Sequence, residues 1–186
     1  MNDILYFTVL GRTEEMKDIH ELYKEAGRLH GHYCPGLAFG VRAGVLACET
    51  LGVVPHNNKE LFCIYEKPAC YVDGVQWTFG TTAGRGSLIY HPSGKAAFSF
   101  YDRSSGKNLR LSLRKLEKNL SKEELIEFIL TGPADEIFYI GPAKLPCPEP
   151  QKAQSYGVCQ CCGEETEQDK LINRDGRLLC IDCAEQ

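Results

Sequence analysis

Cys159-Gln-Cys-Cys162 and Cys180-Ile-Asp-Cys183 are two Cys-x-x-Cys motifs that lie 17 residues apart near the end of the sequence. Each two-residue spacer lets a tight turn direct two sulfurs at one point, and the longer segment can fold back as a hairpin, which suits a tetrahedral zinc ion. Gly163 frees the backbone to turn under the metal, and Asp175-Gly176 predicts the hairpin turn. The motifs therefore predict a zinc ribbon over residues 157–186, with the ligands Cys159, Cys162, Cys180 and Cys183.

A ribbon of this length cannot bury enough apolar surface to order itself, so bound zinc must supply most of its folding free energy, about 10–16 kcal/mol. The alternative is two disulfides, which would need an oxidising compartment. The first residues lack the basic start and long apolar core of a signal peptide, and no later run approaches membrane-spanning length. We therefore expect a cytoplasmic protein with reduced cysteines and no membrane partner, in which Cys161 is surplus to the four zinc ligands.

Charge is distributed unevenly between the ribbon and the rest of the chain. Of the 21 Lys and Arg residues and the 25 Asp and Glu residues, three and seven lie in 157–186, which leaves 18 of each in the remainder. Binding to a phosphate backbone depends on neutralising its charge with Lys and Arg. We therefore expect no nucleic-acid partner for this acidic ribbon, and contact with a protein partner or with a second copy of the chain fits better.

The remainder of the chain combines helical and strand patterns. Apolar residues recur at helical spacing after a possible N-cap at Thr13, Pro35 suits the first position of a second helix, and Ser121-Lys-Glu-Glu124 is a capping box. The patterns predict helices over 14–29, 35–51, 70–79 and 121–130, and strands over 61–65, 87–91, 96–102, 108–114 and 136–140. This order predicts an α+β fold in which a helical N-terminal segment packs on an antiparallel or mixed sheet. We expect a core domain over 1–142, a proline-rich linker over 143–156 and the ribbon over 157–186.

Three glycines, Gly36, Gly40 and Gly44, recur at intervals of four along the second predicted helix. Each internal glycine costs a helix nearly 1 kcal/mol, so a strip of them predicts that another backbone approaches closely. That partner is either a helix of the same chain or a second subunit. We expect a homodimer, in which each ribbon can reach across to the other subunit.

His30-Gly-His-Tyr-Cys34-Pro-Gly places two imidazoles and a thiol within five residues, at the junction of two predicted helices. Cys34 occupies the expected N-cap, where the helix dipole and free N–H groups stabilise a thiolate. Each residue alone has a structural explanation, because a histidine near a helix end is usually a satisfied polar group and a single cysteine usually packs in a core. The cluster as a whole favours a functional role.

A second segment adds Cys70-x-x-Asp73-x-x-Gln76, whose spacing of three places these residues near one face of a helix. Glycines at 80, 84 and 86 follow it and would let the backbone pass close to a ligand or metal. As a phosphate-binding loop this turn is weak, because it has no Gly-Lys-Ser/Thr and lies outside a clear βαβ unit. The remaining cysteines, Cys48, Cys63 and Cys147, are assigned to packing or to the linker.

The run His30-Gly-His-x-Cys-Pro-Gly-x-x-x-Gly40, then Cys70-x-x-Asp73-x-x-Gln76, the glycine-rich turn and Gly94-Lys95-Ala96 closely resemble the FmdE family of formylmethanofuran dehydrogenase proteins. The resemblance covers most of residues 14–140, and many members of that family also end in a four-cysteine zinc ribbon. It implies a dimer of α+β cores, with a cleft thought to hold a metal. The implied site residues are His30, His32, Cys34, Cys70 and Asp73.

One position departs from that family. Its members commonly have Gly-Cys-Thr where this chain has Gly80-Thr81-Thr82, which removes a thiol that the metal site could use. The resemblance also limits the role of the chain in the parent reaction. The parent complex reduces carbon dioxide onto methanofuran with a molybdenum or tungsten pterin cofactor that larger subunits hold, and this chain is too short to hold it. An accessory or stand-alone role is implied.

Three functions remain open. The first is a metal-binding accessory or stand-alone protein, whose core holds a second transition metal, zinc or a similar ion, through thiol and imidazole ligands. The second is a metal-dependent enzyme, in which three protein ligands leave a position for water and the catalytic candidates are Cys34 and Asp73, with Asp73 or the spare histidine as proton carrier. The third is a zinc-ribbon adaptor or regulator whose core cluster is structural. Two metal ions per chain would favour the first two functions, and one ion would favour the third.

Overall fold

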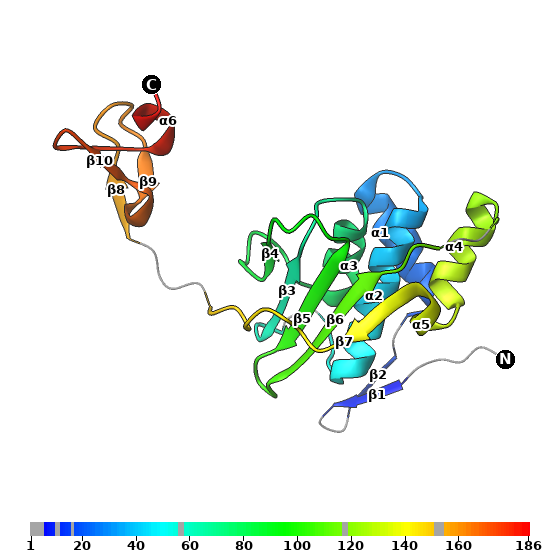
Figure 1. Ribbon diagram of the computed structural model, residues 1–186. Coiled ribbons are helices and arrows are strands. Elements are labelled where there is room, and N and C mark those ends of the chain that lie inside the picture. Colours follow the sequence, from blue (N-terminus) through cyan, green and yellow to red (C-terminus); the bar gives the residue numbers. More distant parts are fainter. Residues whose placement is uncertain (1–5, 10–11, 16, 56–57, 117–118, 151–154) are drawn as a thin grey trace. The chain divides into compact units, whose positions relative to one another are not determined.

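The computed structural model describes residues 6–9, 12–15, 17–55, 58–116, 119–150 and 155–186. The chain forms two compact units, Met1–Pro148 and Glu149–Gln186, which we call the core unit and the ribbon unit (Figure 1). Helices and a mixed sheet make up the core unit, so the predicted α+β class is confirmed. No helix in the described part of the chain is long and apolar enough to cross a membrane.

A five-stranded sheet forms the frame of the core unit. Its strands are β3 (Leu61–Tyr65), β4 (Leu88–Tyr90), β5 (Ala97–Asp102), β6 (Lys107–Leu113) and β7 (Phe138–Gly141). The order across the sheet is β4-β3-β5-β6-β7, with β4 parallel to β3 and every other pair antiparallel. The predicted strand over 136–140 is partly wrong, because a single helical turn, α5 (Ala134–Ile137), follows Pro133 and delays the strand to Phe138. Proline pre-sets the backbone angle that such a turn needs.

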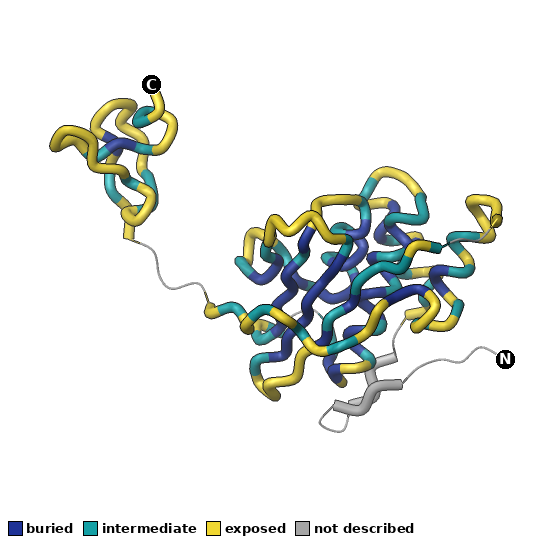
Figure 2. Tube along the Cα trace, in the orientation of Figure 1, coloured by how far each residue is buried: buried dark blue, intermediate teal, exposed yellow. Residues whose placement is uncertain are grey.

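The two faces of the sheet are covered differently. On one face, β-strand side chains such as Phe98 and Phe100 pack against α2 (Pro35–Leu51) and α3 (Tyr71–Phe79), and this layer is the main core (Figure 2). On the other face, Tyr101 lies in a smaller cluster with Leu145, whose carbonyl accepts a hydrogen bond from the Tyr101 hydroxyl at 2.7 Å. The first residues of the segment predicted as a linker therefore lie along the sheet.

The first predicted helix begins later than the sequence pattern indicated. Residues Arg12–Glu15 form β2, antiparallel to β1 (Tyr6–Val9), so Thr13 is in a strand and is not the N-cap. Helix α1 runs over Ile19–His30, and the Asp18 side chain caps it by accepting a hydrogen bond from the His20 N–H. Asp is as good an N-cap as Thr, and a β-branched Thr favours a strand, which explains the error. Met16, which falls within the predicted helix over 14–29, lies outside the described residues.

Helix α4 (Lys122–Thr131) confirms the capping box, because the Ser121 hydroxyl accepts from the Glu124 N–H and the Glu124 carboxylate accepts from the Ser121 N–H. Its buried residues Ile129 and Leu130 pack with Tyr23 and Ala26 of α1 and with the start of α2. Helix α1 is thereby fixed between α4 and the α2–α3 pair, which determines where its C-terminal residue, His30, lies.

The glycine strip of α2 packs against α3 of the same chain. A Cβ atom added at Gly40 would lie 2.0 Å from the Tyr71 carbonyl oxygen, and one added at Gly44 would lie 1.8 Å from the Thr78 hydroxyl oxygen. In return, a Cβ at Gly74 of α3 would lie 2.6 Å from the backbone nitrogen of Val41. The strip is therefore an internal helix–helix contact and does not support the expected dimer, and the homodimer itself stays a prediction.

The ribbon unit consists of two short hairpins and a helical turn. Strands β8 (Tyr156–Val158) and β9 (Glu165–Glu167) pair, as do β10 (Ile172–Arg174) and β11 (Arg177–Leu179), and α6 (Ile181–Ala184) follows. Asp175 and Gly176 both have positive φ angles, 53° and 81°, which is the geometry of a type I′ turn. The predicted hairpin turn is confirmed. Gly163 also has a positive φ, 79°, directly after Cys162.

Candidate metal sites

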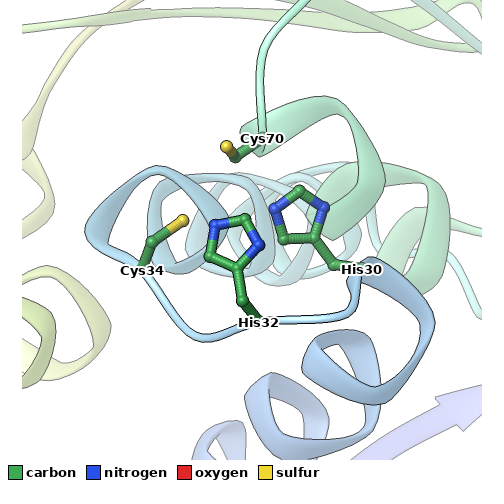
Figure 3. A group of neighbouring side chains, drawn as sticks. All are labelled: His30, His32, Cys34 and Cys70. Carbon is green, nitrogen blue, oxygen red and sulfur yellow. The ribbon is translucent and has the colours of Figure 1, made fainter.

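Four side chains converge in the core unit, three from helix ends and one from a loop. His30 is the last residue of α1, Cys34 is the N-cap of α2, Cys70 directly precedes α3, and His32 lies in the loop between the first two helices. One potential ligand atom of each of these residues lies within 4.8 Å of all the others, and Figure 3 shows the four side chains grouped around one point. We call these four residues the core cluster. The sequence predicted all four of its members.

Cys34 is held at both its sulfur and its backbone. Its Sγ accepts a hydrogen bond from the Leu37 N–H at 3.3 Å, as an N-cap side chain does, and Pro35 starts the helix directly after it. Its carbonyl oxygen accepts a hydrogen bond from the Tyr23 hydroxyl at 3.2 Å. Tyr23 falls within the predicted helix over 14–29, whose apolar spacing did not indicate this polar role.

Cys70 is brought next to Cys34 by the close approach of α2 and α3. A Cβ atom added at Gly36 would lie 3.1 Å from the Cys70 Cβ and 3.7 Å from the Cys34 Sγ, so a side chain at Gly36 would crowd both cysteines. Burial, followed by a hydrogen bond with the Cys34 sulfur, raises the pKa of the Cys70 thiol. A proton shared between two adjacent sulfurs is one that a thiophilic metal ion would displace.

One ring nitrogen of His30 is hydrogen-bonded to a carboxylate, and the other has no hydrogen-bond partner. Its Nδ1 lies 2.7 Å from a carboxylate oxygen of Asp73, and its Nε2 is buried with no hydrogen-bond partner. The carboxylate places the ring proton on Nδ1, which leaves the Nε2 lone pair available. A histidine that ligates a metal almost always donates its other N–H to a carboxylate or carbonyl, so His30 has the environment of a metal ligand.

His32 is the exposed member of the core cluster. Its ring lies with its centroid 4.3 Å from that of His30, and none of the described residues forms a hydrogen bond with its imidazole. Gly31, which precedes it, has a φ of 87° and no heavy atom within 4 Å of the place where a Cβ would be. The loop that carries His32 is therefore open on that side.

Other predicted site features lie away from the core cluster. Thr81, where the family resemblance implied a cysteine, follows the C-terminal end of α3, whereas Cys70 precedes its N-terminal end. Nine helical residues span about 13 Å, so a thiol at position 81 would not reach the core cluster within one chain. Cys48 and Cys63 are buried in the main core, in agreement with their assignment to packing.

The four ribbon cysteines also converge. Their sulfur atoms lie within 4.8 Å of one another, and the pair Cys162 and Cys180 is 3.9 Å apart. The Cys180 N–H donates to the Cys159 sulfur at 3.2 Å. Backbone N–H groups of Cys162, Cys180 and Cys161 lower the pKa of the Cys159 thiol to about 6. Backbone donors that stabilise a thiolate are what a four-thiolate metal site requires.

Two four-donor groups in one chain, one on an α+β core and one in a small ribbon, define a metal-binding protein. A family model for FmdE, described as molybdenum formylmethanofuran dehydrogenase operon, matches residues 29–138. Because this match covers more than half of the sequence, the chain belongs to the FmdE family. A second model, the prokaryotic dksA/traR C4-type zinc finger, matches residues 154–186, which contain the ribbon unit's four cysteines.

Two individual proteins are similar to this chain. A protein of Archaeoglobus fulgidus, named a probable S-adenosyl-L-methionine-binding protein, is 38% identical over 110 residues, which are 56% of this chain and 30% of that protein. This chain therefore spans less than a third of that relative's length. The crystal structure of a tungsten formylmethanofuran dehydrogenase FmdE-like protein from Syntrophus aciditrophicus aligns over 97% of both chains, with a TM-score of 0.65 and 23% identity. That likeness shows a shared fold.

Proposed function

We propose that this chain is an accessory or stand-alone metal-binding protein with two sites. The core cluster, His30, His32, Cys34 and Cys70, holds one transition metal ion, and Cys159, Cys162, Cys180 and Cys183 hold a structural zinc ion. The observation that carries the core site is the buried, unpartnered Nε2 of His30, whose opposite ring nitrogen is fixed by Asp73.

A metal ion would resolve an energetic cost in this region. A buried polar atom without a partner costs about 1–3 kcal/mol relative to one that is satisfied. The Nε2 of His30 carries that cost beside two sulfurs and a second imidazole, and one potential ligand atom of each of these residues lies within 4.8 Å of the others. Two thiolates and two neutral imidazoles suit zinc or another borderline-soft ion, and two thiolates neutralise its charge.

The metal content of purified protein tests the core site. We expect two metal ions per intact chain, and one in the Cys70→Ser variant, because serine cannot replace a thiolate as a ligand of a soft metal. Elemental analysis after dialysis measures this number. Cys147→Ser is the matched control, because Cys147 is exposed and lies outside both groups of four, and this variant should keep two ions.

The opposite results are equally informative. A single ion in the intact chain, under reducing and metal-replete conditions, would mean that the core cluster is structural, and the protein would then be a zinc-ribbon adaptor. Two ions in Cys70→Ser would show that Cys70 is not a ligand.

A second prediction concerns Asp73, which we regard as a positioning residue for His30. Asp73→Ala should lower the affinity of the core site for metal about 10- to 100-fold, the usual effect of losing the partner of a ligating histidine. Asp73→Asn should recover part of this loss, because an amide oxygen can still accept the Nδ1 proton. Competition against a chromophoric chelator measures the affinity. Unchanged affinity in Asp73→Ala would mean that the contact is only a surface ion pair.

A further inference from the structure

We propose that His32 is the exchangeable ligand of the core cluster, so that a metal held by His30, Cys34 and Cys70 can take a neutral donor from outside in its fourth position. This inference rests on the proposed core metal site.

The four members of the core cluster are not held equally by hydrogen bonds and helix ends. His30 is fixed by Asp73, Cys34 by the Leu37 N–H and the Tyr23 hydroxyl, and Cys70 by its place directly before α3. No hydrogen bond with a described residue fixes His32. A ligand that nothing orients recovers its conformational freedom on leaving the metal, which favours exchange.

Solvent exposure also distinguishes His32 from the other three members of the core cluster. His32 is exposed, whereas the other three members are only partly exposed, and the His30 Nε2 is fully covered. A Cβ atom added at Gly31 would have no heavy atom within 4 Å, so the loop that carries His32 is open beside Gly31. In Figure 3, His32 lies on the connecting loop, while His30 and Cys34 lie at the ends of helices. Three partly buried ligands and one exposed ligand are the arrangement of a site that can accept an external ligand.

Charge indicates the class of that ligand. A divalent ion with two cysteine thiolates is neutral, and the Asp73 carboxylate beside His30 adds one negative charge. An anionic ligand would meet repulsion at this site, so a neutral donor such as water, an imidazole or an amine is favoured.

The test uses the full-length protein loaded with cobalt(II), with imidazole as the probe. Cobalt absorption bands report the ligand set, and the ribbon contributes a constant four-thiolate spectrum to every variant. An imidazole that replaces the His32 ring leaves the donor set unchanged, so equilibrium dialysis of isotope-labelled imidazole measures its binding. We expect the intact protein to take up one imidazole per core ion in a saturable way. His32→Ala should keep two cobalt ions and reach half-saturation at an imidazole concentration about tenfold lower. This factor is expected if His32 occupies the fourth position about nine-tenths of the time in the intact protein and so competes with imidazole. His91→Ala, at an exposed histidine outside the core cluster, should behave as the intact protein does.

Each result decides a separate point. Loss of the core cobalt from His32→Ala, with the far-ultraviolet circular dichroism unchanged, would make His32 a fixed ligand and overturn this inference. Two bound ions without saturable imidazole uptake, in both the intact protein and His32→Ala, would also overturn it while leaving the core site intact. One cobalt ion in the intact protein would instead refute the proposed core site itself.

Discussion

Cys180→Ser is expected to release the ribbon zinc and to unfold the ribbon unit. Cys180 supplies one of four converging sulfurs, and its backbone N–H donates to the Cys159 sulfur. Only Cys159 and Leu179 are buried among the described side chains of this unit, so it has almost no apolar core to keep it folded. Structural zinc contributes about 10–16 kcal/mol in such ribbons, far more than any other single interaction here.

The measurements are zinc content and limited proteolysis. We expect one ion fewer per chain, together with rapid cleavage within residues 157–186, while the core unit stays resistant. Cys161→Ser is the matched control. Cys161 lies between two ligands in the sequence but is exposed and is not one of the converging sulfurs, so this variant should keep its zinc. Full zinc occupancy in Cys180→Ser would contradict the assignment of the four ligands.

Gly40→Ala should destabilise the core unit by about 3 kcal/mol or more, because the added methyl group would overlap backbone rather than a movable side chain. The nearest three atoms, at 2.0–2.8 Å, all belong to the Tyr71 backbone. Alanine would otherwise favour the helix by nearly 1 kcal/mol, so a net loss of stability cannot come from helix propensity and must come from the contact. The free energy of unfolding, from urea titration followed by circular dichroism, measures it.

Gly84→Ala is the control for this substitution. No heavy atom lies within 4 Å of a Cβ at Gly84, and its φ is not in the positive region, so its stability should change by less than about 0.5 kcal/mol. If Gly40→Ala instead leaves a stable but monomeric protein, the strip would be a contact between subunits and the packing of α2 on α3 would be wrong. Equal stability of the Gly40→Ala and Gly84→Ala variants would likewise contradict that packing.

Local chemistry marked the candidate residues of the core cluster in the sequence, and the family resemblance grouped Cys70 with His30, His32 and Cys34. Pro35 and the capping position of Cys34 fix the start of α2, and the spacing of the ribbon cysteines fixes their turn geometry. These patterns involve only a few neighbouring residues, so they can be interpreted without knowledge of the tertiary fold.

Signals that depend on tertiary contacts were missed or left open. The glycine strip predicted a close approach but could not distinguish a helix of the same chain from a second subunit. Either partner requires a face of α2 without side chains. Gly74 falls within the predicted helix over 70–79, and its role as the reciprocal contact with α2 depends on both helices being in place. The start of α1 was misplaced because residues 12–15 pair with a strand, and strand pairing depends on a partner segment more than on local pattern.

The convergence of three helix ends on one point has a kinetic consequence. A metal bound there would join residues 30 and 70, which are 40 positions apart in the sequence, and would close a long loop of the chain. Removing the ion through its fixed ligands would require α1, α2 and α3 to separate at these ends, a local unfolding event rather than a side-chain rotation. Ligand exchange at His32 and departure of the ion would then proceed on different timescales, the first fast and the second limited by opening of the helices.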